Sequence, residues 1–144
     1  MAALEAEWLL DLARQAAAAA YAPYSGFQVG AVVLGEGGGL YSGCNVENAS
    51  YGISLCAERA AIAAAIRAGE RHLVGLAVWG ARLGQAPAPC SPCGACRQAL
   101  AEFGGPDLPI WSAGADGVPV TWTLGALLPE AFALPGEGHG GERD

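Results

Sequence analysis

Apolar and β-branched residues gather in five short runs that predict β-strands. The runs cover residues 28–34, 40–46, 73–80, 109–113 and 118–123. Four glycines stand between the first two runs, which are therefore expected to form a hairpin. The third run is apolar without a break, as is typical of a strand buried at the centre of a sheet.

Segments rich in alanine, with apolar residues at helical spacing, predict the helices. They cover residues 2–20, 55–68, 91–103 and 124–128. Gly69 supplies a stop signal for the second helix. The third helix is expected to open with Ser91 as its N-cap and Pro92 at its first position, where the missing N–H costs nothing.

The order of these elements, α-β-β-α-β-α-β-β-α, predicts an α/β fold. We expect a three-layer α/β/α sandwich around a mixed five-stranded sheet. A chain of 144 residues suits one domain, expected over residues 1–134. Residues 135–144 are glycine-rich and polar and are expected to form a flexible tail.

The charged residues exclude several classes of partner. Seven basic residues, all of them arginine, stand against fourteen acidic ones, for a net charge of −7. Nucleic acids and anionic membranes bind proteins that carry clusters of Lys and Arg, so neither is expected as a partner. A hydrophobic content of 53% excludes a disordered chain.

The N-terminal segment does not resemble a secretion signal. Glu5, Glu7 and Asp11 stand where such a signal carries positive charge. No run approaches the roughly 18 apolar residues of a membrane span. We therefore expect a cytoplasmic protein with reduced thiols, in which a Cys-x-x-Cys pattern is more often metal-binding or catalytic than cross-linking.

Three of the five cysteines are placed to bind zinc. Cys93 and Cys96 are three residues apart at a predicted helix start, where both sulfurs can face one side and the helix dipole favours thiolates. Cys56 begins another helix, and two helix starts that follow adjacent strands can face one crevice. Three protein ligands with an open fourth position are the arrangement of a catalytic zinc, here one Zn²⁺ per chain.

Such a zinc site would give roles to two charged residues that follow Cys56 closely in the sequence. Glu58 stands in a helix rich in Ala and Ile, where burying a carboxylate is costly unless it has a partner or a function. Residues two apart on an ideal helix point to nearly opposite sides, so we infer that Cys56 occupies the cap or first turn. Because three thiolates give zinc a net negative charge, Arg59 is expected to donate to the sulfurs and restore Lewis acidity.

A closed structural zinc site is an alternative, with Cys44 or Cys90 as the fourth ligand. A Cys-x-x-Cys pair alone does not separate the two kinds of site. The sequence Cys-Ala-Glu at 56–58, followed by Pro-Cys-Gly-Ala-Cys at 92–96, matches the signature of zinc deaminases, with Cys in place of His as the first ligand.

With these motifs the chain resembles the cytidine deaminase family, in its short, homotetrameric form with three cysteine ligands. Further family motifs follow in family order: Tyr-Ser-Gly-Phe-Gln-Val-Gly-Ala at 24–31, Gly-Cys-Asn-Val-Glu-Asn-Ala at 43–49, Cys-Ala-Glu-Arg at 56–59, Ser-Pro-Cys-Gly-Ala-Cys-Arg-Gln at 91–98, and Leu-Leu-Pro at 127–129 before Phe132. The resemblance runs from about Tyr21 to Phe132. It implies that Cys56, Cys93 and Cys96 bind zinc and that Glu58 is the proton shuttle.

The resemblance also implies how a substrate is held. Phe27 would stack on the pyrimidine, and Asn45 with Glu47 would hold the ribose 3′-hydroxyl. Ala57 would give its backbone N–H to the base carbonyl.

Three further roles are implied by the family. Tyr51 and Phe132 would reach into a neighbouring subunit's site in a homotetramer. Gln98, like Arg59, would support the metal ligands.

The implied activity is zinc-dependent hydrolysis of cytidine and 2′-deoxycytidine to uridine and 2′-deoxyuridine, with release of ammonia, in pyrimidine salvage. A blasticidin S-type deaminase and a non-catalytic zinc-stabilised module are the alternatives. Phe27, Asn45 and Glu47 resemble the stacking residue and ribose clamp of the nucleoside enzymes. No Lys or Arg cluster is available for a phosphate or a single strand of nucleic acid, so the expected substrate is an uncharged nucleoside.

Overall fold

The structure, a computed structural model, describes residues 2–135. The elements are α1 (Ala2–Ala17), β1 (Phe27–Gly35), β2 (Leu40–Cys44), the 3-10 turn η1 (Tyr51–Ile53), α2 (Ala57–Arg67), β3 (Leu73–Arg82), α3 (Gly94–Phe103), β4 (Pro109–Ala113), β5 (Pro119–Thr123) and α4 (Leu124–Leu127). Apart from η1, this is the predicted order. The expected flexible tail lies outside the described residues beyond Pro135. Within residues 2–135, no helix is both long and apolar enough to cross a membrane.

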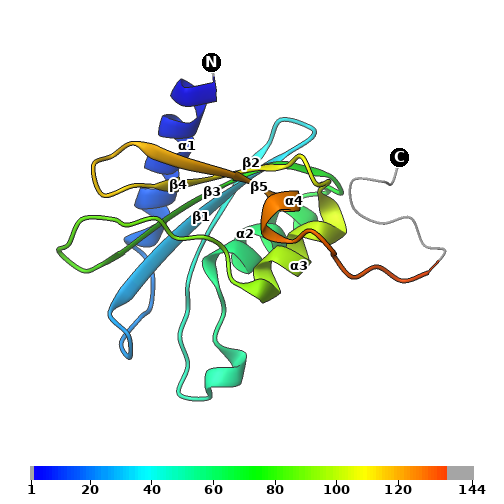
Figure 1. Cartoon of the computed structure of the whole chain (residues 1–144). Helices are drawn as coiled ribbons and strands as arrows, with labels where there is room; N and C mark the ends of the chain where they lie inside the picture. The colour runs from blue at the N-terminus through cyan, green and yellow to red at the C-terminus, as the bar shows by residue number, and fades with distance from the viewer. Residues whose placement is uncertain (1, 136–144) are drawn as a thin grey trace.

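The five strands form one mixed sheet in the order β2-β1-β3-β4-β5. β3 and β4 pair in parallel, and the other neighbours pair antiparallel. The expected hairpin is confirmed as β1 with β2, and the expected central strand as β3. Helix α1 covers one face, while α2 and α3 cover the other (Figure 1), each face with its own apolar cluster. The three-layer α/β/α sandwich is thus confirmed.

Two glycines let helices lie directly on the sheet. A Cβ atom at Gly30 of β1 would stand 1.8 Å from the carbonyl oxygen of Ala13 in α1. A Cβ atom at Gly43 of β2 would stand 2.5 Å from the backbone nitrogen of Ala61 in α2. Backbone atoms cannot rotate away as a side chain can, so these positions must lack a side chain. The close approach of α2 brings its N-terminus, with Cys56, against the edge of the sheet.

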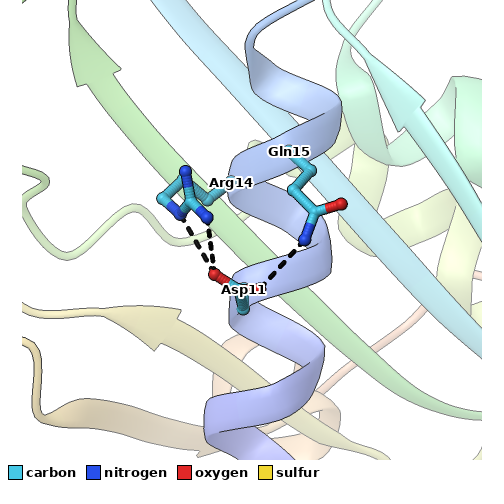
Figure 2. A network of polar contacts seen from close by, with 3 residues as sticks. All are labelled: Asp11, Arg14 and Gln15. Carbon is cyan, nitrogen blue, oxygen red and sulfur yellow. Dashed lines mark hydrogen bonds and ion pairs between the residues drawn. The ribbon is translucent and has the colours of Figure 1, made fainter.

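The outer face of α1 carries a network of exposed polar contacts centred on Asp11 (Figure 2). The carboxylate of Asp11 accepts hydrogen bonds from Arg14 Nη2 at 2.7 Å and from Gln15 Nε2 at 2.9 Å. These bonds, with that from Arg14 first, lower the pKa of Asp11. Exposed contacts of this kind contribute little to stability. The network lies on the exposed surface of α1, on the opposite side of the sheet from α2 and α3 (Figure 1).

Helix α1 and strand β2 are the elements that end furthest before their predicted ends. Helix α1 ends at Ala17 rather than at residue 20, because the next turns tighten into contacts three residues apart, such as Ala18 N–H to the Gln15 carbonyl. Strand β2 ends at Cys44 because Val46 leaves the ladder and makes isolated bridges.

The predicted start of the third helix is wrong. Helix α3 begins at Gly94, and its N-cap is Cys93 rather than Ser91. Cys93 has extended backbone, with φ −67° and ψ 170°, so the helical turns begin only after it. Pro92 therefore precedes the helix instead of occupying its first position.

Candidate metal centre and active site

Two helix N-termini meet on one face of the sheet, and each has a cysteine as its N-cap. Cys56 caps α2 and Cys93 caps α3. The expectation that they follow adjacent strands is wrong, because α2 follows β2, α3 follows β3, and β1 lies between those strands. The helix starts converge because α2 and α3 contact each other on the same face.

Three thiols lie together at this point. The Sγ atom of Cys93 is 3.9 Å from that of Cys56 and 3.5 Å from that of Cys96, and the three sulfurs lie within 4.8 Å of one another. Cys96 is fully buried and Cys93 is exposed. Tetrahedral zinc with bonds of about 2.3 Å to sulfur places its sulfurs about 3.8 Å apart. The donor set and its spacing therefore fit zinc.

The thiols differ in how readily they ionise. Burial raises the pKa of Cys96 and, against the opposing effect of Arg59, that of Cys56. Burial also acts on Cys93, but hydrogen bonds from the Cys96 and Ala95 backbone and contacts with the other thiols bring its pKa below the usual value. Adjacent thiols become thiolates together when a cation shares them, so metal binding and proton release are coupled here.

Arg59 lies against the first of these cysteines. Its Nη2 is 3.9 Å from Cys56 Sγ and 3.3 Å from the carbonyl oxygen of Ser54. The contact with Cys56 is the main reason that the pKa of Arg59 is raised. Its Nε is buried and has no hydrogen-bond partner among the described residues. The structure thus contains the expected contact between the guanidinium and the thiol of Cys56.

Glu58 is the second residue of α2, and only 5% of it is exposed. Burial raises the pKa of its carboxyl group. Its charge also raises the pKa of Cys96, which places the carboxylate near the thiols. The inference that Cys56 occupies the helix cap is confirmed. Because a cap lies outside the helical repeat, Cys56 and Glu58 can serve one site.

Phe27, the first residue of β1, lies over Gly80 of β3. A Cβ atom at Gly80 would stand 2.9 Å from Phe27 Cζ and 3.3 Å from Cys90 Sγ. The Phe27 ring and the Cys90 thiol therefore both pack against Gly80. Burial, followed by the charge of Glu58, raises the pKa of Cys90 to about 11. Phe27 and Glu58 are therefore both neighbours of Cys90.

Asn45 follows β2 and ties it to β1. Its Oδ1 accepts the Val29 N–H at 2.9 Å, and its Nδ2 donates to the Phe27 carbonyl at 2.9 Å. The side chain thereby extends the pairing of the two strands and holds the backbone of Phe27.

Glu47 binds the turn that precedes β1. Its Oε1 accepts the N–H groups of Tyr24 and Ser25 at 2.9 and 3.1 Å, and its Oε2 accepts the Ser25 hydroxyl at 2.5 Å. The hydroxyl is the leading cause of a lowered pKa for Glu47. In this structure, Asn45 therefore holds the first residues of β1, and Glu47 holds the turn directly before it.

A cavity of about 370 Å³ adjoins Glu47. Its lining consists of Tyr24, Ser25, Glu47, Asn48, Tyr51 and Ser54, with no Lys or Arg. Tyr51 is 77% exposed and meets Tyr24 edge to face, with ring centroids 6.3 Å apart. A larger cavity, about 480 Å³, lies at the starts of β3 and β4 and contains none of the predicted site residues.

Phe132 is 68% exposed, and its backbone is held by Gln98. Gln98 Nε2 donates to the Phe132 carbonyl at 3.0 Å, and the Phe132 N–H donates to Gln98 Oε1 at 3.3 Å. The side chain of Gln98, expected beside the metal ligands, thus positions the backbone of Phe132.

Arg97 is a positioning residue that the sequence reasoning missed. Its guanidinium donates to the Pro92 carbonyl at 2.7 Å, the Leu127 carbonyl at 2.9 Å and the Ser91 hydroxyl at 3.3 Å. It thereby ties the segment before Cys93 to α4. The sequence feature that could have identified Arg97 is its place directly after Cys96, the last cysteine of the motif.

A closed site with four cysteines is not supported by this geometry. Within residues 2–135, the group of converging ligand atoms consists of Cys56, Cys93 and Cys96. Cys44 and Cys90 are free thiols outside it. Fold and site together define a zinc-binding α/β domain in which three cysteines lie beside a buried glutamate.

The comparison with known families agrees with this class. The family model for the cytidine and deoxycytidylate deaminase zinc-binding region matches residues 4–111. The chain belongs to this family.

Relatives along the whole domain support the assignment. The chain is 41% identical to the cytidine deaminase of Sporosarcina psychrophila over 130 residues, 90% of this chain and 93% of the relative. It is 46% identical to the cytidine deaminase of Mycobacterium tuberculosis over 122 residues, 85% of each. The crystal structure of cytidine deaminase from Burkholderia pseudomallei matches with a TM-score of 0.78 and 43% identity, over 87% of this chain and 97% of that one. The resemblance to this family and the α/β fold predicted from the order of the elements are confirmed.

Proposed function

We propose that the chain is a hydrolase that converts cytidine and 2′-deoxycytidine to uridine and 2′-deoxyuridine in pyrimidine salvage. One water is consumed and one ammonia is released per turnover. The observation that carries this proposal is the gathering of three thiols and one buried carboxyl group where α2 and α3 begin. The relatives, which are cytidine deaminases, support it.

Cys56, Cys93 and Cys96 would hold one Zn²⁺ and leave a fourth position open. The bound metal supplies the Lewis acidity that makes water a nucleophile near neutral pH. Arg59 and the positive ends of the two helix dipoles offset the charge of the thiolates.

Glu58 moves the protons of the reaction. Its carboxylate accepts a proton from water while the water oxygen attacks C4 of the cytosine, and it delivers a proton to N3, which draws electron density from C4. The carboxylate then takes the proton of the hydroxyl now on C4 and delivers it to the exocyclic amine, which leaves as ammonia as the C4 carbonyl forms. A carboxyl group whose pKa is raised by burial suits a residue that acts first as base and then as acid.

The nucleoside is held by residues around this centre. Phe27 stacks on the pyrimidine, and Asn45 and Glu47 hold the ribose 3′-hydroxyl. Ala57 begins α2, so its N–H has no partner within the helix and donates to the base carbonyl. The cavity beside Glu47 has no Lys or Arg in its lining, which favours an uncharged nucleoside over a nucleotide.

Ammonia release from a panel of substrates tests this function. We expect turnover of cytidine and deoxycytidine, with kcat/KM about 100-fold lower for CMP and blasticidin S, and about one zinc per chain in the same sample. A preference for blasticidin S would show that the proposed substrate is wrong and that the chain is a blasticidin S-type deaminase. Full zinc occupancy with no displaceable water ligand and no ammonia release would identify a zinc-stabilised module.

We further propose that the chain is cytoplasmic and forms a homotetramer with sites shared between subunits. The segment between β2 and α2 supports this assembly, because it projects from the sheet and carries η1 (Figure 1). Tyr51 and Ile53 in this segment are 77% and 69% exposed, and Phe132 is 68% exposed. Exposed apolar side chains on a projecting segment, such as Tyr51 and Ile53, are typical of an interface.

Analytical ultracentrifugation tests the assembly. Wild type is expected to sediment as four chains, and Ile53→Glu is expected to yield smaller species, because the interface would have to bury a charge. Val118→Glu changes an exposed apolar residue in the turn between β4 and β5 and should remain tetrameric. A wild type that sediments as a single chain at all concentrations would exclude shared sites.

A further inference from the structure

Ser25 connects the residues that the proposed function assigns to the ribose and to the base. Its hydroxyl donates to Glu47 Oε2 at 2.5 Å and accepts the backbone N–H of Phe27 at 3.0 Å. A hydroxyl has one proton to donate. Since the Phe27 N–H points at the Ser25 oxygen, that proton is directed to the Glu47 carboxylate. The Ser25 side chain thus fixes the position of the Glu47 carboxylate relative to the first residue of β1.

The backbone of Ser25 is held on both sides. Its N–H donates to Glu47 Oε1 at 3.1 Å, and its carbonyl accepts from Arg82 Nη1 at 2.6 Å. The next residue, Gly26, has φ +70°, which only glycine adopts readily, and its carbonyl accepts the Leu83 N–H at 3.3 Å. The turn is therefore clamped between Glu47 and the end of β3.

The contacts of Glu47 leave a defined place for a substrate hydroxyl. A carboxylate has about four acceptor positions. Within the part of the chain that the structure describes, Tyr24 N–H and Ser25 N–H occupy two on Oε1, and the Ser25 hydroxyl occupies one on Oε2. One position on Oε2 remains. The lowered pKa keeps Glu47 ionised at neutral pH, so this position accepts a hydrogen bond.

We propose that Ser25 is a positioning residue that aims the remaining acceptor of Glu47 at the ribose 3′-hydroxyl while it holds Phe27 against the base. The proposal rests on the proposed function, because it assumes a nucleoside in this cavity. Ser25 acts through Glu47 and Phe27. Its loss should therefore impair discrimination by the sugar more than proton transfer at the base.

Substrate discrimination provides the first test. We compare kcat/KM for cytidine and for 3′-deoxycytidine, which lacks the 3′-hydroxyl, in wild type, Ser25→Ala and Ser25→Thr. Ser25→Ala should lower the preference for cytidine about tenfold, since hydrogen bonds to charged groups contribute on this scale. Ser25→Thr keeps the hydroxyl and should restore most of the preference. Ser42→Ala, the same change at an exposed serine of β2, should leave it unchanged.

Titration of Glu47 provides a test that is independent of activity. Carboxyl ¹³C shifts of labelled glutamate, assigned with Glu47→Gln, should show a higher pKa for Glu47 in Ser25→Ala and no change in Ser42→Ala. A wild type inactive on cytidine would overturn the proposed function and the sugar contact, while the titration would still decide whether Ser25 holds Glu47. An active wild type whose Ser25→Ala variant keeps both the substrate preference and the Glu47 pKa would overturn the role of Ser25 and leave the function intact.

Discussion

Replacement of Glu58 by glutamine is expected to lower kcat for cytidine by about 10³- to 10⁴-fold while the zinc content stays near one per chain. The amide has the shape of the carboxylate but can neither take a proton from water nor deliver one to N3. The three thiols are unchanged, so metal binding persists. Because burial opposes the ionised form of Glu58, the neutral amide should unfold at no lower temperature than wild type.

The measurement pairs ammonia release with metal analysis on the same preparation. Glu7→Gln makes the same chemical change on the exposed face of α1 and should be as active as wild type. If Glu58→Gln deaminated cytidine at the wild-type rate, the assignment of proton transfer to Glu58 would be wrong. Loss of zinc together with activity would instead give Glu58 a role in holding the metal site.

Replacement of Cys96 by serine is expected to abolish zinc binding and activity together. Cys96 is buried in the first turn of α3, and a serine hydroxyl there does not ionise to replace the thiolate. Metal that binds only the folded state at about 1,000 times its dissociation constant stabilises it by about 4 kcal/mol. For a domain of this size, its loss should lower Tm by about 10 °C. Chelation of wild type should produce the same shift.

Cys44→Ser and Cys90→Ser are the matched controls for the zinc count. Both thiols lie outside the group formed by Cys56, Cys93 and Cys96, so each variant should keep about one zinc per chain. If either control lost its zinc as fully as Cys96→Ser, the site would be a closed one with four cysteines, and the open position required for catalysis would not exist.

Spacing along the chain was enough to predict the two halves of the chemical centre. Cys93 and Cys96 are three residues apart at the start of α3, and Glu58 follows the N-cap Cys56 by two residues, so each pair is close in any fold that forms its helix. The start of α3 could not be read in the same way. Ser91 and Pro92 have good local signals for a helix start, but Cys93 adopts extended backbone, and the helix begins after it.

Contacts that join distant segments were the part that sequence reasoning missed. The Ser25 hydroxyl meets Glu47 22 residues away, and Arg82 reaches the Ser25 carbonyl across 57 residues. Gln98, expected beside the metal ligands, holds the backbone of Phe132 34 residues away. None of these residues stands in a local pattern that selects its partner, because side-chain rotamers and loop paths are settled only when the layers pack.

The sequence by itself determined the order of the elements, the glutamate two residues after Cys56 and the family, because each depends on residues close together in the chain. The tertiary structure decided which cysteines share a site and how the substrate residues are held. Packing of α2 and α3 on one face brings Cys56 to Cys93 and leaves Cys44 and Cys90 outside. The same compaction sets Glu47 against the turn before Phe27. Such contacts depend on the whole sheet, because strand pairing places β2, β1 and β3 side by side.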